Sequence, residues 1–235
     1  KMMIYIYENG YEGSSVYSKV IHRYSLYLPV SKANFNRRLY FIDKINQTVG
    51  KRDVSKVASI ACGPAIEVID YLKDHSIDYN RCQITCMDSE PKALEYIKHK
   101  ISMIEKETGK KLNNIILKNN NVVDLLFAKK IDKLLDKQDL IYAAGLIDYF
   151  DDKVATKFIE TMYDKLNDGG QLIIGNVSSE YAHRAYTEML GEWYLNCRNE
   201  KDMLSLARNV KNCKKVYIEH EPLTKMNLFL NIYKK

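Results

Sequence analysis

The chain has 235 residues, of which 46% are hydrophobic and 28% are charged, and its formal net charge is +6. This length suits one α/β domain, or one domain with a small cap, and the composition is that of an ordinary globular protein. The Lys and Arg residues are scattered and form no stripe between aromatic residues, so we expect no nucleic-acid partner. No apolar run approaches the roughly 20 residues that span a bilayer, so we expect no membrane partner either.

The cysteines number five, and they are Cys62, Cys82, Cys86, Cys197 and Cys213. An odd number without a CxxC pair is not the pattern of a disulfide framework or of a zinc site. We therefore expect no metal, free cysteines packed in the core, and a protein of the reducing cytoplasm.

The first fifty residues have the pattern of a helical arm. Residues 2–7 alternate poorly and predict a short strand or an ordered tail. Apolar and aromatic residues at helical spacing predict a helix over 16–28, which Pro29 would end. A second helix is predicted over about 31–45. Its apolar face is expected to carry Phe35, Leu39 and Ile42.

The stretch 57–67, VASIACGPAIE, organises the rest of the chain. It begins as an apolar, β-prone run, breaks at the small residues Ala61, Gly63 and Ala65, and continues as a helix with an apolar face. Small side chains let a ligand approach the backbone, and the N–H groups of such a turn are free to donate. A strand, a tight turn and a helix N-terminus in this order indicate a site for a nucleotide-like ligand.

An acidic residue, Asp88, follows Gly63 by twenty-five positions and ends a second apolar run, residues 84–87. A carboxylate at the end of the second strand of such an α/β protein can accept hydrogen bonds from ribose hydroxyls. Asp88 is therefore the predicted ribose ligand.

Together these features resemble motif I and the acidic end of strand 2 in class I S-adenosylmethionine-dependent methyltransferases, in the branch that acts on small molecules. In that family the motif usually reads as an acidic residue, an apolar residue and G-x-G-x-G. Its three glycine positions are here Ala61, Gly63 and Ala65. Its acidic position is Ser59, and Glu67 is the only acid in the stretch. The resemblance implies S-adenosylmethionine as cofactor and leaves open which residue binds its amino group.

The order of the later predicted elements is also similar to that family. A helix, the letters NDGG and a strand follow one another, and the chain ends in two strands that suit an antiparallel hairpin. The resemblance implies a doubly wound α/β fold with a seven-stranded, mostly parallel sheet, an antiparallel C-terminal hairpin strand and an N-terminal helical cap. We expect an arm or lid over residues 1–50 and a methyltransferase domain over residues 51–235.

The elements expected in the main domain follow from periodicity and turn residues. The predicted strands are 57–62, 82–87, 114–117, 140–144, 171–175, 215–219 and 226–233. The predicted helices are 65–75, a helix capped by Ser89, and those over 122–136, 152–166 and 200–209.

Contacts with the cofactor are implied at the ends of the first four strands. Asn121 is the candidate for the adenine, because its amide can donate to and accept from a purine edge; the alternative is a plain Asn-rich turn. Leu146 is expected to pack against the adenine, and the small residues after the fourth strand leave room for the ligand. The implied cofactor-binding residues are Ala61, Cys62, Gly63, Glu67, Asp88, Ser89, Asn121, Val122, Ala143, Ala144 and Gly145.

Candidates for catalysis and for contact with the methyl acceptor come from the segments after the fourth and fifth strands. His183 is the first candidate base, because a side-chain pKa near 6.5 suits proton transfer at neutral pH. Asp148 and Tyr149 lie where a substrate would enter, although Asp148 could also cap a helix. For a carboxylate acceptor an arginine would suffice. The candidates for contact with the acceptor are Tyr17, Tyr24, Trp193, Tyr194 and Arg198; each could instead be a packing or surface residue.

Several functions fit these features. The first is methyl transfer to an oxygen, nitrogen or carboxylate of a small-molecule substrate. The second is an enzyme of the same fold that transfers or cyclises the aminopropyl or aminocarboxypropyl group and releases methylthioadenosine instead of adenosylhomocysteine. A nicotinamide enzyme is disfavoured because G-x-G-x-x-G is absent. A silent binding module and a macromolecular methyltransferase remain further alternatives. The tyrosine-rich arm could close over the ligand or form a homodimer.

Overall fold

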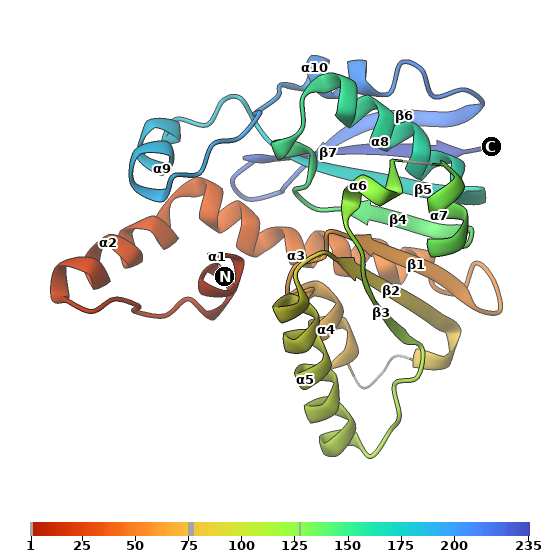
Figure 1. The fold of residues 1–235 in the computed structure, drawn as a ribbon, viewed down its shortest axis with the longest axis horizontal. Coiled ribbons are helices and arrows are strands. Elements are labelled where there is room, and N and C mark those ends of the chain that lie inside the picture. The colour runs from red at the N-terminus through yellow and green to blue at the C-terminus, as the bar shows by residue number, and fades with distance from the viewer. Residues whose placement is uncertain (1, 75–77, 127) are drawn as a thin grey trace.

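A computed structural model describes residues 2–74, 78–126 and 128–235, which form one twisted sheet with helices on both faces (Figure 1). The described strands lie in the order β3-β2-β1-β4-β5-β7-β6. Strands β1 to β5 are parallel, whereas β7 runs antiparallel to β5 and β6. The predicted fold class is confirmed. The strands are β1 (Ser55–Ile60), β2 (Cys82–Asp88), β3 (Ile115–Asn119), β4 (Gln138–Ala143), β5 (Leu166–Val177), β6 (Cys213–His220) and β7 (Asn227–Lys234).

Two apolar clusters attach the helices to the sheet. On one face, Phe158 and Met203 belong to a cluster that continues into β4, β5 and β7. On the other face, Phe41 and Val68 belong to a cluster that continues into β1 and β2. The α-helices are α1 (Met2–Glu8), α2 (Val16–Tyr27), α3 (Pro29–Thr48), α4 (Ile66–Leu72), α5 (Pro91–Thr108), α6 (Val122–Leu125), α7 (Ala128–Leu134), α8 (Asp152–Asp164), α9 (Arg184–Gly191) and α10 (Glu200–Leu206); η1 (Tyr79–Arg81) and η2 (Ile147–Tyr149) are 3₁₀ turns.

The strand order places a crevice at the centre of the sheet. From β1 the chain continues to β2 on one side, whereas β4 lies on the other side of β1. Ligands of open parallel sheets bind beyond the carboxyl ends of the strands at such a reversal of direction. The residues that follow β1 and β4 are therefore the ones that the fold brings to a binding site.

Most of the arm is helical and consists of α1, α2 and α3. Residues Met2–Glu8 form α1, so the predicted strand or tail is wrong. Helix α2 ends before Pro29 as predicted, and the same proline begins α3. Proline suits the first helical position because its fixed φ matches the helix and its missing N–H would have no partner there.

Helix α3 belongs to the core, and its predicted apolar face is correct at Ile42, which packs against the core, but wrong at Leu39. Phe41 and Ile45 are buried, whereas Leu39 is 59% exposed. The reason is tertiary: α3 crosses the sheet, and the Phe41 ring stacks on Tyr142 of β4 with centroids 4.5 Å apart and contacts Phe229 of β7 edge-on at 5.4 Å. Apolar residues occur on several sides of this helix, so the sequence alone does not select the side that the sheet covers.

Other boundaries also differ from the predictions. The helix predicted over 122–136 is two helices, α6 and α7, and residue 127 between them lies outside the described residues, as does residue 75 of the helix predicted over 65–75. Strand β5 begins at Leu166 and includes the NDGG letters, because its first residue pairs with Gln138 of β4. The cap of α5 is Glu90 and not Ser89, since the Glu90 side chain accepts from the N–H of Lys92.

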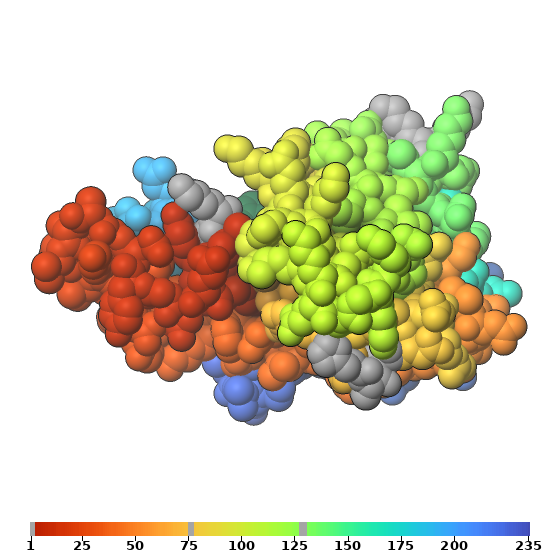
Figure 2. Space-filling model, turned by 90° about the horizontal axis from the view of Figure 1, so that it is seen from below, coloured from red at the N-terminus to blue at the C-terminus, as the bar shows by residue number. Residues whose placement is uncertain are grey.

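The arm forms a lobe at one end of the molecule, and the segment around α9 lies beside it (Figures 1 and 2). Contacts of α3 with α4 and β7 join this lobe to the main body. Among the described helices, none has both the length and the apolar character that crossing a membrane requires.

Candidate functional site

The turn after β1 is held open by three residues with left-handed backbone. Ala61, Gly63 and Ala65 have φ angles of 50°, 54° and 44°. Left-handed backbone costs an L-residue such as alanine about 1–2 kcal/mol, because its Cβ crowds the following carbonyl, whereas glycine avoids this cost. A Cβ built on Gly63 would meet no described atom within 4 Å. The turn therefore presents small residues to the space above it, as the sequence predicted. The predicted free N–H groups are wrong for Cys62, Gly63 and Ala65, because these N–H groups donate to the carbonyl of Met87, to Asp88 and to the carbonyl of Cys62.

Asp88 fixes this turn from the neighbouring strand. Its Oδ2 accepts from the N–H of Gly63 at 2.7 Å, and its Oδ1 accepts from the N–H of Glu90 at 2.9 Å. Each carboxylate oxygen keeps a further lone pair for a ligand. The two features from which the sequence predicted a nucleotide site are thus in direct contact.

A cavity of about 190 Å³ opens between this turn and the arm. The turn and the ends of β1 and β4 form its floor, and α1 and α3 contribute its other side. Among the residues predicted for the site, those that line it are Ala61, Cys62, Gly63, Glu67, Ala144, Gly145, Asp148, Tyr149 and Trp193.

Two residues of α3 that the sequence analysis did not select also line this cavity. Arg37 donates through Nη1 to Asn34 Oδ1 at 2.8 Å and to the carbonyl of Ala144 at 3.1 Å. The Nε of Arg37 and the Nδ2 of Asn34 are buried, and neither finds an acceptor in the described part of the chain. A buried donor without a partner costs about 1–3 kcal/mol, so the pair is poised for an anionic or polar ligand. In the sequence, Asn34 and Arg37 are marked only by their spacing of three, which makes them neighbours on the surface of a helix.

Two buried acids lie in the same cavity. Glu67 is 6% exposed, and its Oε1 accepts from the hydroxyl of Tyr142 at 2.9 Å. Burial raises the pKa of Glu67, and Arg37 partly opposes this. Burial also raises the pKa of Asp148 to about 6, although the hydrogen bond from the N–H of Val177 and the charges of Arg37 and Arg198 act to lower it. The cavity thus combines one fixed cation with two acids whose ionisation depends on the ligand and on pH.

Cys62 belongs to the wall of the cavity and is not a nucleophile. Its hydrogen bond with Cys86 and its burial raise the pKa of the Cys62 thiol far above neutral pH. Nucleophilic cysteines need the opposite, a lowered pKa in an electropositive setting.

The remaining predicted cofactor residues do not line the cavity. Asp88 is the last residue of β2, and Ser89, Asn121 and Val122 follow the ends of β2 and β3 on the same edge of the sheet. Asn121 caps α6, and its Oδ1 accepts from the N–H of Val123 at 2.9 Å, so the plain turn or cap that was the alternative is present. Ala143 is the last residue of β4 and is fully buried.

The acceptor candidates are scattered. Tyr17 and Tyr194 are 76% and 65% exposed. Tyr24 is half exposed and contacts the ring of Tyr186 edge-on. His183 precedes α9 and lines neither the cofactor cavity nor the one described below. Trp193 lines both cavities and donates through Nε1 to the hydroxyl of Tyr149 at 2.9 Å.

Arg198 is a structural residue and lies outside the cavities. It is 4% exposed, and its guanidinium donates to the Asp152 carboxylate at 2.9 Å, to Asn176 Oδ1 at 2.7 Å and to the carbonyls of residues 147 and 150. These bonds join the segments after β4 and β5 and leave no donor that faces a substrate. The predicted substrate contact is therefore wrong.

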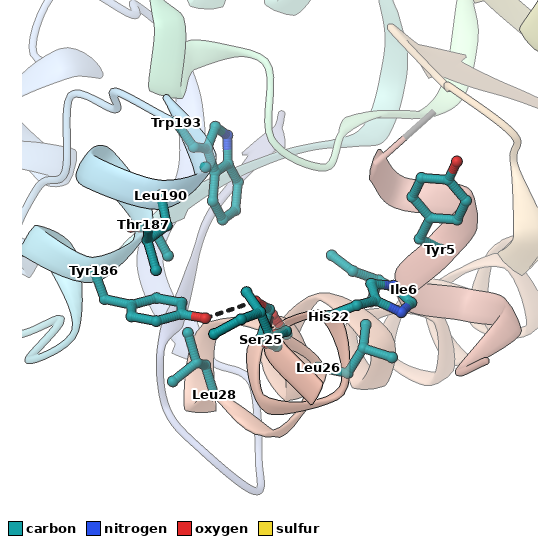
Figure 3. Close-up of a pocket in the computed structure, with 13 residues that line it drawn as sticks. Tyr5, Ile6, His22, Ser25, Leu26, Leu28, Tyr186, Thr187, Leu190 and Trp193 are labelled. Carbon is teal, nitrogen blue, oxygen red and sulfur yellow. Dashed lines mark hydrogen bonds between the residues drawn. The ribbon is translucent and has the colours of Figure 1, made fainter. Parts of the chain in front are cut away.

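A second cavity, of about 200 Å³, lies between α1, α2 and α9 (Figure 3). Its residues come from the two ends of the sequence, and Ser25 of α2 shares a 3.0 Å hydrogen bond with the hydroxyl of Tyr186 of α9. The arm and the α9 segment are thus joined over this space.

No protein-family model and no curated protein matches the sequence. Solved structures do resemble the fold. One is a possible exported protein from Bordetella parapertussis, with 17% identity, a TM-score of 0.70 and an alignment that covers 99% of this chain and 77% of that chain. Another is magnesium protoporphyrin IX methyltransferase (ChlM) from Synechocystis PCC 6803 with bound SAH, with 11% identity, a TM-score of 0.63 and coverage of 98% and 91%.

A third similar structure is the S-adenosylmethionine-dependent methyltransferase SibL, with 14% identity, a TM-score of 0.57 and coverage of 95% of this chain. This chain spans 64% of the SibL chain, and 58% of the chain of the carbon methyltransferase CurJ. At these identities the likeness establishes the fold, and the activity has to be argued from the residues of this chain.

Proposed function

We propose that this chain, which has the fold of the class I S-adenosylmethionine-dependent methyltransferases, binds S-adenosylmethionine with its amino acid end in the cavity between the β1 turn and the arm, and transfers its methyl group to a small molecule. The observation that carries the proposal is the set of unpaired donors on Arg37 and Asn34 in the same cavity as the buried acid Glu67. A ligand with an amino acid end satisfies both sides of the cavity: its carboxylate accepts from Arg37 and Asn34, and its ammonium group donates to Glu67. A ligand that is only a nucleoside leaves them unpaired.

Each part of the cofactor has a matching group in the chain. Arg37 and Asn34 take the methionine carboxylate, because a guanidinium and a carboxylate form strong charge-assisted hydrogen bonds. Glu67 takes the ammonium group, which the sequence left without a ligand. Asp88 takes the ribose hydroxyls. Asn121 and Val122 remain our candidates for the adenine, through the Nδ2 group that the cap of α6 does not use.

The chain also supplies the groups for the reaction itself. When bound, S-adenosylmethionine supplies an electrophilic methyl group on a sulfonium. Asp148 has a pKa of about 6, so it is ionised at neutral pH and can take the proton that an acceptor hydroxyl or amine loses. The arm and Trp193 hold the acceptor and exclude water. We assign the base to Asp148 and not to His183, because Asp148 lines the cavity and His183 does not.

Calorimetric titration tests the binding half of the proposal. We expect S-adenosylmethionine and adenosylhomocysteine to bind with micromolar affinity, and methylthioadenosine and NAD to bind much more weakly, because neither carries the amino acid end. Preference for methylthioadenosine would favour aminopropyl or aminocarboxypropyl chemistry instead. Absence of binding by all four would contradict the proposal.

A further inference from the structure

The cavity between α1, α2 and α9 is walled by apolar side chains (Figure 3). Its described lining contains no Asp, Glu, Lys or Arg, so a charged ligand would enter it without a partner for its charge. The volume of about 200 Å³ is below the roughly 300–1,000 Å³ of drug-sized sites. The apolar side chains are Ile6, Ile21, Leu26, Leu28, Leu190 and Trp193.

One polar group in this cavity is unused. The Nδ1 of His22 accepts from the backbone N–H of Glu12 at 2.9 Å, so in the neutral ring the proton sits on Nε2. That Nε2 is buried, and no acceptor for it occurs among the described residues. The edge-on ring of Tyr5, with centroids 5.6 Å apart, holds the imidazole in place. His22 therefore offers a fixed N–H donor in an apolar space.

The hydroxyl groups around His22 are already paired. Ser25 donates to the carbonyl of Ile21 at 2.9 Å and shares its other bond with Tyr186. Ser31 donates to the carbonyl of Ser25 at 2.7 Å, and Thr187 donates to that of Arg184 at 3.0 Å. The donor of His22 is thus the feature of the wall that selects a ligand by hydrogen bonding.

This cavity and the cofactor cavity share two walls. Trp193 lines both of them. Helix α1 turns Met3 and Tyr7, one helical turn apart, to the cofactor cavity and Tyr5 and Ile6 to the second one. A molecule in the second cavity is therefore separated from the cofactor cavity by side chains of α1 and by one indole.

From these contacts we propose that the cavity of α1, α2 and α9 binds the apolar body of the methyl acceptor, whose reacting group extends past Trp193 to the cofactor cavity, and that the acceptor is a small, uncharged, mostly apolar molecule with an oxygen that accepts from His22 Nε2. This inference rests on the proposed methyl transfer for the role of the ligand, whereas the class of ligand follows from the cavity alone. His22 is a specificity-determining residue here, because an apolar molecule without such an oxygen leaves the buried N–H unpaired.

The sole tryptophan lies in the wall, so its fluorescence reports occupancy without any enzyme assay. The probe is cyclohexyl methyl ketone, and the matched charged probes are cyclohexanecarboxylate and cyclohexylmethylammonium, which keep the ring. We expect a saturable change with the ketone and binding at least 10-fold weaker for both ions. The ketone is titrated with and without saturating adenosylhomocysteine, and its affinity is expected to be retained. Competition between the two, or equal binding of an ion, would overturn the proposal.

Two variants of His22 separate the loss of the Nε2 donor from an effect on the fold. In His22→Asn the amide oxygen can replace Nδ1 as the acceptor for Glu12, but no donor reaches the position of Nε2. In His22→Gln the amide nitrogen can reach that position. We expect the ketone to bind about 3- to 10-fold more weakly to His22→Asn than to His22→Gln, as the loss of one net hydrogen bond predicts. Equal affinities would remove His22 from the site.

The two proposals fail in different ways. Calorimetry with adenosylhomocysteine measures the cofactor cavity, and the ketone measures the second cavity. Ketone binding without adenosylhomocysteine binding would leave an apolar ligand site in a protein that is no methyltransferase. Adenosylhomocysteine binding without a saturable ketone signal would keep the cofactor and overturn the acceptor site.

Discussion

Arg37 of α3 and Asp148 of η2 border the same small space beside the backbone of Gly145. A Cβ built on Gly145 would lie 2.9 Å from Arg37 Nη1 and 3.1 Å from Asp148 Oδ2. The glycine therefore leaves the space in which a cation of the arm and an acid of the sheet edge approach each other. The arm and the edge of the sheet thus come together at the candidate cofactor site.

Removal of the Arg37 guanidinium should affect only ligands with a carboxylate. We expect Arg37→Met to weaken adenosylhomocysteine by about 1.5–3 kcal/mol, roughly 10- to 150-fold, and to leave methylthioadenosine unchanged. Calorimetry of both ligands checks this. The control is Arg38→Met, because Arg38 pairs with Asp70 at 2.7 Å and does not line the cavity. Equal losses for the two ligands would show that Arg37 acts on the fold and not on the carboxylate.

Asp88 has one role in the turn and another toward the ligand. We expect Asp88→Ala to weaken the cofactor by about 1.5–3 kcal/mol, because a charged hydrogen-bond acceptor for the ribose is lost. Asp88→Asn keeps an oxygen for the N–H of Gly63 and should weaken adenosylhomocysteine by a smaller amount. Unchanged calorimetric affinity in the alanine variant would remove the ribose assignment.

Alanine substitutions at two glycines should have different effects, one mainly on ligand binding and the other on stability. In Gly145→Ala the new methyl group meets the ends of the Arg37 and Asp148 side chains, which can shift more easily than backbone, so we expect a smaller loss of stability than in Gly175→Ala and weakened adenosylhomocysteine binding. In Gly175→Ala the Cβ would lie 2.3 Å from the backbone oxygen of Ala144, which cannot move aside. Overpacking of this kind costs about 1–3 kcal/mol. Urea denaturation and calorimetry of both variants test the contrast; a strongly destabilised Gly145→Ala would contradict it.

Asp148 makes stability depend on pH. Its pKa rises from 3.8 to about 6 in the fold, mainly through burial. The folded state therefore holds the proton more tightly, so this contribution is full below the unfolded pKa and is lost as pH rises through about 6. The gap corresponds to about 3 kcal/mol in total, of which about 2 kcal/mol falls between pH 4.5 and 7.5.

Asp148→Asn removes this titration and provides the reference. We expect the free energy of unfolding of the wild type, minus that of the variant, to fall by about 2 kcal/mol between pH 4.5 and 7.5 in urea denaturation. A difference that stays constant, or that rises with pH, would mean that Asp148 is not buried in the way described.

Arg198 should matter for folding and not for the ligand. Its loss leaves the side-chain oxygen of Asn176 without its donor and removes one of two donors from the carbonyls of Ile147 and Phe150. We expect Arg198→Met to lower the free energy of unfolding by about 2–4 kcal/mol, since one buried unpaired acceptor costs about 1–3 kcal/mol and several charge-assisted hydrogen bonds are lost with it. The control is Arg184→Met, whose exposed pair with Glu188 should contribute less than about 1 kcal/mol.

The order of strands and helices, the turn of small residues after β1 and the contact between Gly63 and Asp88 follow from local patterns. Apolar runs and helical periods can be read directly from the sequence. Parallel strands bring their carboxyl ends to one edge of the sheet, so a turn and an acid at the ends of two adjacent strands lie close together. The position of Asp88 beside the turn was predictable from spacing for this reason, whereas its contact with a ribose stays a prediction. Element boundaries were less accurate, because pairing with a neighbouring strand, as for Leu166 with Gln138, extends an element beyond its own pattern.

The tertiary structure alone decided which side of α3 faces the sheet, and with it the presence of Arg37 and Asn34 in the cofactor cavity. Arg37 and the carbonyl of Ala144 are 107 residues apart in sequence, and no local pattern links them. The same holds for the cavity of His22, whose walls come from both ends of the chain, and for the pKa of Asp148, which burial sets. The sequence encodes the secondary-structure preference of each segment, whereas a site made of side chains that are distant in sequence forms only when the apolar faces of the helices pack on the sheet.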